Sequence, residues 1–251
     1  MTLFLNRGLS LSSGSISAVP HGIFVTATDT GVGKTVVATG LVRLLARHGR
    51  RVVGLKPVAS GAELTTDGLR NADALALASA SSVARPYELT NPYCFEPAIA
   101  PHLAAREAGD AISVDALVDW YARAAGGAEV AIVEGAGGWR VPLHPDGFLS
   151  DLPERLGLGV VLVVGLRLGC LNHARLTLEA IASTGRCAFV GWVGNRIDPG
   201  FARLEDNLAT LECLLGSPPL AVVPPLEVAD AAAAVACLDQ PRLLRAVFPP
   251  Q

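Results

Sequence analysis

The sequence predicts an α/β fold in which helices flank a mostly parallel β-sheet. Short β-branched runs recur along the 251 residues, and segments with helical spacing separate them. Small aliphatic residues dominate a composition that is 51% hydrophobic and only 5% aromatic. Alternating strands and helices build parallel sheets covered on both faces, and small side chains let the helices pack closely on such a sheet.

Six runs are expected to form strands, because each is short, rich in β-branched residues and bounded by Gly or Pro. They span residues 22–27, 51–58, 129–135, 160–165, 188–195 and 220–223. Helices are expected at residues 34–48, 73–80, 102–108, 113–125, 172–184 and 201–215. No long polar linker divides the chain, so residues 21–251 are expected to form one domain, preceded by a poorly ordered extension over residues 1–20.

Charge and cysteine content narrow the classes of function. A formal net charge of −3 with mixed signs gives no general attraction to nucleic acid or to an anionic membrane. No apolar run approaches the roughly 18 residues that span a bilayer. The five cysteines are scattered and form no C-x-x-C pair, which favours reduced thiols in a cytoplasmic protein over a disulfide framework or a zinc site.

The stretch VTATDTGVGKT, residues 25–35, ends the first expected strand and opens the first expected helix. Its glycines let the backbone fold around phosphate, Lys34 can reach terminal phosphate oxygens, and the Thr35 hydroxyl can bind Mg²⁺. The usual G-x-x-x-x-G-K-[ST] spacing would require a glycine where Thr28 stands. A glycine turn with solvated Lys and Thr is the alternative, but the flanking strand and helix favour a phosphate loop.

Polar residues also follow other expected strands, at the edge of the sheet where ligands of such folds bind. Glu134 ends an apolar strand, either as a carboxylate near Mg²⁺ or as a solvated strand-end acid. Lys56 ends another strand before Pro57, which cannot continue the ladder. With Ser60 it can hold an anionic substrate, although an isolated lysine is more often solvated.

Two expected helix starts leave alternatives open. Asp73 is a candidate metal ligand, but spacing alone favours a capping role for Asn71 or Asp73. Free N–H groups around Cys170 to Asn172 can bind a carboxylate, unless Asn172 is an ordinary helix cap.

These pieces together resemble the dethiobiotin synthetase family, in order, over residues 22 to about 226. The similar segments are FVTATDTGVGKT, KPVASG, GLRNADALAL, NPYCFEPAIAPHLAA, VEGAGGW, LGCLNHARLT and GWVGN. The resemblance implies a P-loop NTPase fold, a phosphate loop one residue longer than usual, and a homodimer. It also implies a reaction of biotin biosynthesis, in which 7,8-diaminopelargonate, CO₂ and MgATP give dethiobiotin, ADP and phosphate through a carbamate and a carbamic-phosphoric anhydride.

The resemblance assigns the catalytic and metal-binding roles to residues of this chain. It places Lys34 and Lys56 at the carbamate and the γ-phosphate. It places Thr35, Asp73 and Glu134 around Mg²⁺.

The resemblance likewise assigns substrate and nucleotide contacts. Thr30 and Ser60 would contact the diamine. The substrate carboxylate would meet N–H groups at Cys170, Leu171 and Asn172, from the partner subunit. The nucleotide-binding residues would be Gly31, Val32, Gly33, Lys34, Thr35, Val36, Asp73, Glu134, Gly135, Ala136, Gly137, Asn195, Arg196, Pro224, Pro225 and Leu226.

Two positions of the phosphate loop depart from the family pattern. Ala27 stands where the loop usually begins with Gly, and Gly31 stands where Glu is common. Loss of that carboxylate leaves the choice of nucleotide open between ATP and another nucleoside triphosphate.

Two other functions share parts of this pattern. An ATP-driven switch of the partitioning type would need a basic patch or a terminal basic amphipathic helix, and the sequence shows neither. A cobyrinate amidase-like ligase usually carries a glutamine-hydrolysing domain, for which this chain has no room. We therefore expect small-molecule substrates as partners, with no nucleic acid and no membrane, and no role is expected for residues 227–251.

Overall fold

The computed structural model describes residues 21–225 and 231–248, and its centre is a six-stranded sheet. All neighbouring strands are parallel, in the order β12–β11–β10–β1–β7–β2. The predicted α/β class with a mostly parallel sheet is confirmed. The six strands are β1 (His21–Ala27), β2 (Val52–Leu55), β7 (Val130–Glu134), β10 (Gly159–Gly165), β11 (Phe189–Asn195) and β12 (Ala221–Val223).

The strand order places a topological switch point beside β1. From β1 the chain continues to β2 at one edge and returns through β7, and only then crosses to β10, β11 and β12 on the other side. Ligands of doubly wound sheets bind at the carboxyl ends of the strands where the order reverses. The phosphate loop and the segment after β7 both begin at this place.

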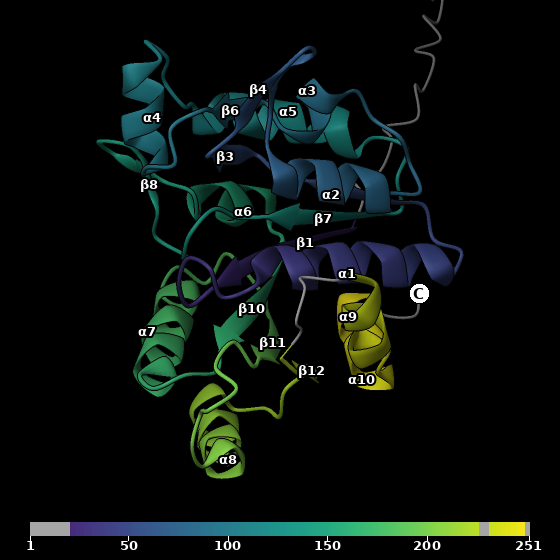
Figure 1. Ribbon diagram of the computed structural model, residues 1–251, viewed down its shortest axis with the longest axis vertical. Coiled ribbons are helices and arrows are strands. Elements are labelled where there is room, and N and C mark those ends of the chain that lie inside the picture. The colour runs from purple at the N-terminus through teal and green to yellow at the C-terminus, as the bar shows by residue number, and fades with distance from the viewer. Residues whose placement is uncertain (1–20, 226–230, 249–251) are drawn as a thin grey trace, which may run out of the picture.

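Ten helices within the described residues cover the two faces of the sheet (Figure 1). They are α1 (Lys34–Arg47), α2 (Ala72–Ala80), α3 (Tyr87–Thr90), α4 (Pro101–Glu107), α5 (Val114–Ala125), α6 (Asp151–Leu156), α7 (Cys170–Ala182), α8 (Leu204–Leu215), α9 (Ala231–Leu238) and α10 (Pro241–Val247).

Strand β1 alternates between the two faces, as period two requires. Ile23 and Val25 pack in one core cluster with Leu41 of α1, and that cluster also includes residues of α2, α9 and α10. Phe24 packs in another cluster with Leu117 of α5 and with residues of α6. A third cluster joins β10 and β11 to α7 and α8 on the same side as α5. Because both faces of the sheet are buried, the candidate functional groups lie at the carboxyl ends of its strands.

The strand expected over 51–58 ends earlier, at Leu55. Pro57 has no N–H for the ladder, so the chain leaves the main sheet and Val58–Ser60 pairs elsewhere. The sequence analysis also missed several short strands, because segments of two or three residues show no measurable periodicity. The short strands outside the main sheet are β3 (Val58–Ser60), β4 (Glu63–Thr65), β5 (Gly68–Arg70), β6 (Tyr93–Phe95), β8 (Pro142–His144) and β9 (Gly147–Phe148).

The end of the described chain also departs from expectation. Residues 227–251 were given no role, yet 231–247 contain α9 and α10, which lie beside α1 and β12 (Figure 1, yellow). Leu238, Leu243 and Val247 are fully buried in the core on the α1 face. This segment therefore completes the hydrophobic core.

Two further expectations concern the extension over residues 1–20 and the absence of membrane-spanning segments. The extension over residues 1–20 lies outside the described residues. Among the helices of the described segments, none is long and apolar enough to cross a membrane.

Candidate active site

The phosphate loop joins β1 to α1 and takes a backbone shape that requires glycine. Gly31 and Gly33 have φ angles of 73° and 88°, in the left-handed region. A Cβ on Gly33 would lie 2.1 Å from Asn195 Nδ2, whereas nothing lies within 4 Å of a Cβ on Gly31. The same Asn195 amide donates a hydrogen bond of 2.9 Å to the carbonyl of Val32. The end of β11 therefore braces the loop, and Gly33 makes the close approach possible.

The start of α1 is free to receive an anion. Gly33 is the N-cap, and no side chain caps this helix of 14 residues. The first N–H groups of an uncapped helix lack partners, and the helix dipole favours negative charge beside them. The expected nucleotide residues Thr35 and Val36 lie in this first turn.

Lys34 begins α1 and is only 7% exposed. Within the described part of the chain, its ammonium makes one hydrogen bond, of 3.2 Å, to the carbonyl of Asp29. Burial, together with the nearby positive charge of Lys56, lowers the pKa of Lys34 to about 8. A buried ammonium with one such partner would gain more binding free energy from an anionic ligand than a solvated lysine would.

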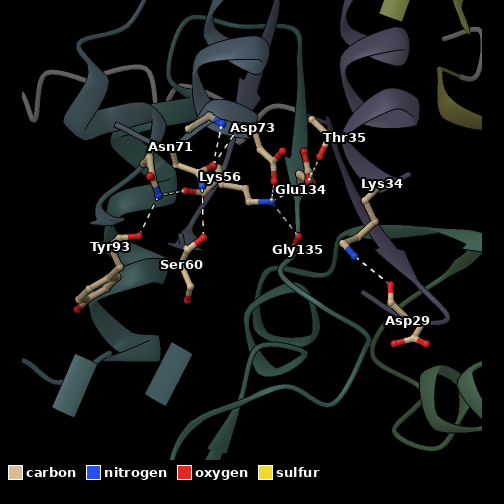
Figure 2. A network of polar contacts seen from close by, with 12 residues as sticks. Asp29, Lys34, Thr35, Lys56, Ser60, Asn71, Asp73, Tyr93, Glu134 and Gly135 are labelled. Atoms are coloured by element: carbon tan, nitrogen blue, oxygen red, sulfur yellow. Dashed lines mark hydrogen bonds and ion pairs between the residues drawn. The ribbon is translucent and has the colours of Figure 1, made fainter. Parts of the chain in front are cut away.

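Four elements bring their side chains together around Lys56, at the end of β2 (Figure 2). Its Nζ lies 2.6 Å from Glu134 Oε1, at the end of β7, and 2.9 Å from Asp73 Oδ2 on α2. The Thr35 hydroxyl of α1 donates to the same Glu134 oxygen at 2.8 Å. The carbonyl of Gly135 lies 3.4 Å from the ammonium. We call Thr35, Lys56, Asp73 and Glu134 the lysine–carboxylate network.

Burial and charge act against each other in this network. Lys56 is 3% exposed and Glu134 is fully buried. Burial opposes the charge of Lys56, but Glu134 and Asp73 together hold its pKa above the usual value. Burial also opposes the charge of Asp73, yet Lys56 beside it lowers the pKa of that carboxyl. Complete burial raises the pKa of Glu134 against the attraction of Lys56. Each charged form has a close partner of opposite sign, which offsets part of the cost of burial.

The structure resolves the alternatives at the start of α2. Asn71 is the N-cap, and its Oδ1 accepts hydrogen bonds from the N–H groups of Asp73 and Ala74 at 3.1 and 3.3 Å. Of the two capping candidates, Asn71 is therefore the cap, and the Asp73 carboxylate is instead directed to Lys56. Ser60 lies nearby, with its carbonyl accepting from Asn71 Nδ2 at 3.4 Å. The Ser60 hydroxyl is buried and has no hydrogen-bond partner among the described residues.

The other expected nucleotide residues lie at neighbouring strand ends. Gly135, Ala136 and Gly137 follow β7, and a Cβ on Gly137 would lie 3.5 Å from the Thr30 hydroxyl. Arg196 follows β11, and its N–H donates to the carbonyl of Val223 in β12 at 2.9 Å. Two further residues, Pro224 and Pro225, are exposed directly after β12, while Leu226 lies outside the described residues.

The start of α7 differs from the expected arrangement. Gly169 is the N-cap without a side-chain hydrogen bond, so the alternative of Asn172 as a cap is wrong. Cys170 is buried, Leu171 is half-buried and Asn172 is exposed. No hydrogen bond among the described residues joins Cys170–Asn172 to the lysine–carboxylate network.

Sequence reasoning missed two polar contacts near the site. Arg167 Nη2, in the turn before α7, lies 2.5 Å from Asp29 Oδ2 in the phosphate loop. Asn91 Nδ2 donates to the carbonyl of Lys56 at 2.8 Å and supports the chain where it leaves β2. An acid inside a phosphate loop was the available signal for the first contact, because it calls for a nearby cation. No sequence pattern indicates the second contact, between Asn91 and the carbonyl of Lys56.

The donor set of the network fits Mg²⁺. Asp73, Glu134 and Thr35 offer oxygen atoms, which are the ligands that Mg²⁺ prefers, and Glu134 Oε2 is buried without a hydrogen-bond partner. Across the described residues, no group of three or more His, Cys, Asp or Glu side chains could hold a metal alone. A metal ion here would be bound by these protein oxygens together with oxygens of a bound phosphate, as is usual for Mg²⁺.

Comparison with known proteins agrees with the motif set. A family model described as an AAA domain matches residues 21–233. The ATP-dependent dethiobiotin synthetase BioD of Chromohalobacter salexigens is 55% identical over 215 residues, which cover 82% of this chain and 90% of that protein. The chain belongs to the dethiobiotin synthetase family. Its relatives of the same name from Pseudomonas aeruginosa and Xanthomonas oryzae are 54% and 45% identical, over 86% and 89% of this chain and 95% and 99% of theirs. The chain is therefore an enzyme of a ligase family.

Solved structures confirm the P-loop NTPase fold. The MinC:MinD cell division complex of Aquifex aeolicus aligns with a TM-score of 0.54 and 15% identity, over 90% of this chain and 92% of that chain. A ParA family ATPase from Chlorobium tepidum aligns with a TM-score of 0.53 and 17% identity, over 93% and 94%. At such identity the likeness concerns the fold alone. The much closer sequence relatives favour the ligase family over a partitioning switch.

Proposed function

We propose that this protein is an ATP-dependent dethiobiotin synthetase of biotin biosynthesis, acting on 7,8-diaminopelargonate and CO₂. The observation that carries the proposal is the lysine–carboxylate network, set directly beside a phosphate loop. Such an arrangement suits a reaction that gathers several anions, because two ammonium groups and a helix N-terminus can neutralise them.

The reaction implied by the family begins when one amine of the substrate adds to CO₂, loses a proton and becomes a carbamate. The carbamate oxygen then attacks the γ-phosphorus of ATP, and ADP leaves. The second amine attacks the carbonyl of the resulting mixed anhydride, and phosphate leaves as the ring closes. Each step moves negative charge, so positioning and electrostatic stabilisation are what the protein must supply.

In this proposal Lys56 and Lys34 hold the carbamate and the γ-phosphate near each other. The uncapped start of α1 offers N–H groups to the phosphates. The near-complete burial of Lys56 and Glu134 limits water at the reacting centre, which protects the mixed anhydride from hydrolysis. Thr35, Asp73 and Glu134 would hold Mg²⁺, whose positive charge would stabilise the phosphate oxygens.

The remaining proposed contacts to substrate and nucleotide involve residues near the strand ends and at the start of α7. The buried, unpartnered Ser60 hydroxyl and the exposed Thr30 would contact the diamine. The substrate carboxylate would bind at the start of α7 of the partner subunit in a cytoplasmic homodimer. The nucleotide base would bind near Asn195, Arg196, Pro224, Pro225 and Leu226.

The test is the dependence of ADP release on each substrate. Purified protein should release ADP only when Mg²⁺, bicarbonate and 7,8-diaminopelargonate are all present, with dethiobiotin formed in equal amount. Repeating the assay with GTP, CTP and UTP would define the nucleotide choice left open at Gly31. Turnover without the diamine, or turnover stimulated by DNA or lipid vesicles, would contradict the proposal.

A further inference from the structure

The ion pair between Asp29 and Arg167 joins the phosphate loop to the turn before α7. Arg167 Nη2 lies 2.5 Å from Asp29 Oδ2, although the two residues are 138 positions apart in the sequence. Asp29 belongs to the phosphate loop, and Arg167 belongs to the turn between β10 and α7. Both side chains are a little under half exposed, at 43% and 44%.

Asp29 makes contacts in three directions. Its Oδ1 accepts a hydrogen bond of 2.7 Å from the N–H of Thr30, while Oδ2 faces Arg167. Its carbonyl accepts the 3.2 Å hydrogen bond from Lys34 Nζ. The Asp29 side chain therefore positions the N–H of Thr30, which is proposed to contact the diamine, whereas Lys34, proposed to hold the γ-phosphate, contacts the backbone carbonyl.

Arg167 is placed in the same way at the start of α7. Its carbonyl accepts a hydrogen bond of 3.1 Å from the N–H of Cys170, the first residue of the helix. Leu166 and Cys170 are buried on either side, but Leu168 between them is 92% exposed and cannot anchor the turn. The Arg167 side chain is thus a polar link from this turn to the phosphate loop, in addition to the 3.5 Å contact between the N–H of Gly165 and the Thr28 hydroxyl.

We propose that Asp29 and Arg167 are positioning residues that fix the orientation of Thr30 in the phosphate loop, and so determine how the diamine is held. The inference rests on the proposed function, since it concerns the same substrate. A half-exposed ion pair contributes little to global stability. The effect of breaking it should therefore be seen in substrate binding rather than in folding.

The experiment measures steady-state kinetics of ADP release in Arg167→Gln, Asp29→Asn, the double variant and Arg167→Lys. Arg167→Gln should raise the KM for the diamine about fivefold to tenfold, the range of one charge-assisted hydrogen bond, with little change in the KM for ATP. Arg167→Lys should restore the KM, because a single nitrogen contact needs no guanidinium fork. The double variant should be no worse than the more impaired single variant, because both changes remove one interaction.

Arg175→Gln is the matched control. It breaks the 2.7 Å ion pair with Glu179, which is also about half exposed and lies on α7 beyond its first turn. It should leave the diamine KM unchanged. Equal changes in the KM values for ATP and the diamine, additive effects in the double variant, or no effect of Arg167→Gln in an active enzyme would overturn the inference.

A second measurement separates this inference from the proposed function. Hydrogen exchange in the nucleotide-free protein should accelerate at the amides of Thr30 and Cys170 in Arg167→Gln, and not in Arg175→Gln. If the unmodified protein shows no diamine-dependent ADP release, the proposed function fails. If it does, and exchange at both amides is unchanged in Arg167→Gln, only the positioning role fails.

Discussion

Two buried lysines lie in one site in opposite electrostatic situations. Lys56 is held by two carboxylates at 2.6 and 2.9 Å, which keep its pKa above the usual value. Lys34 has one backbone carbonyl at 3.2 Å among its described neighbours, and its pKa is lowered to about 8. Burial alone would disfavour the charge of both groups, so the difference comes from the partners that the fold provides.

The comparison shows that the two lysines have different roles in the site. Around Lys56 the fold has already neutralised the charge, and the network holds four elements in place. Around Lys34 the charge is left for a ligand to neutralise, which costs stability in the free protein and raises the gain on binding an anion. This contrast between a satisfied and an unsatisfied cation can be broken or sharpened by substitution, from the largest expected effect on stability and function to the smallest.

Lys56→Met should have the largest effect, because it leaves the buried Glu134 without its cation. We expect a loss of about 3 to 5 kcal/mol of unfolding free energy, the usual result of breaking a buried ion pair on one side. Urea denaturation of the nucleotide-free protein measures it. Dethiobiotin formation should be abolished, while ATP binding, followed by calorimetry, should be largely retained. A loss of ATP affinity that matches the loss of activity would contradict the proposed role of Lys56.

The double variant Lys56→Met with Glu134→Gln is the control for this prediction. Replacing both members of a buried pair by uncharged groups of similar shape is often nearly neutral. Stability should therefore return to within about 1 kcal/mol of the unmodified protein, without recovery of activity. If the double variant is as unstable as Lys56→Met, the loss comes from packing and not from the unpaired charge.

Gly33→Ala should have the next largest effect. Its φ of 88° disfavours a side chain, and the new Cβ would meet Asn195 Nδ2 at 2.1 Å. We expect a loss of about 2 kcal/mol or more in unfolding free energy, together with a loss of ATP binding as the loop moves from Asn195. Thermal unfolding and nucleotide titration would show both. Normal ATP affinity in Gly33→Ala would mean that the loop does not need this support from β11.

Lys34→Met should have the opposite sign to Lys56→Met. Removing a buried ammonium with one carbonyl partner should leave the unfolding free energy unchanged or raise it by up to about 1 kcal/mol. The affinity for ATP should fall about tenfold to a hundredfold, since a charge-assisted hydrogen bond to phosphate is lost. If Lys34→Met destabilises the free protein as strongly as Lys56→Met does, the contrast between the two lysines is wrong.

Gly31→Ala should have the smallest effect of the four. Its φ of 73° imposes backbone strain of about 1 kcal/mol on a side chain, but the space around the new Cβ is open. ATP affinity should therefore change little, in contrast to Gly33→Ala. A loss of affinity as large as that of Gly33→Ala would show that Gly31 is needed for the shape of the bound loop and not only of the free one.

Local chemistry made part of this molecule predictable from the sequence. The parallel sheet follows from apolar runs bounded by Gly and Pro, and the phosphate loop follows from glycines between a strand and a helix. The meeting of Lys56 with Asp73 was implied only by the family resemblance. Residue patterns alone favoured a capping role for Asn71 or Asp73 and could not show the ion pair of Asp73, because that pair depends on how α2 packs beside β2.

The features that the sequence did not reveal depend on distant contacts. The Asp29–Arg167 pair spans 138 positions, and no local pattern reports such a distance. The end of β2 before Pro57 could have been inferred from the sequence, since proline cannot continue a ladder. The pairing of Val58–Ser60 with β6 could not. Helices α9 and α10 were missed because the segment does not match the family motifs, and their burial against α1 is a tertiary property.

The position of α9 and α10 has a consequence for synthesis on the ribosome. Strand β1 and helix α1 are made before their partners, because the neighbours of β1 begin at residues 130 and 159, and α9, which packs on α1, begins at residue 231. The nascent chain therefore carries these apolar surfaces unpaired until the residues from 130 onward have been made. Chains of this size fold through intermediates that expose such surfaces to aggregation. In the growing polypeptide, the phosphate loop is present early, but the core beneath it closes only when α9 and α10 emerge.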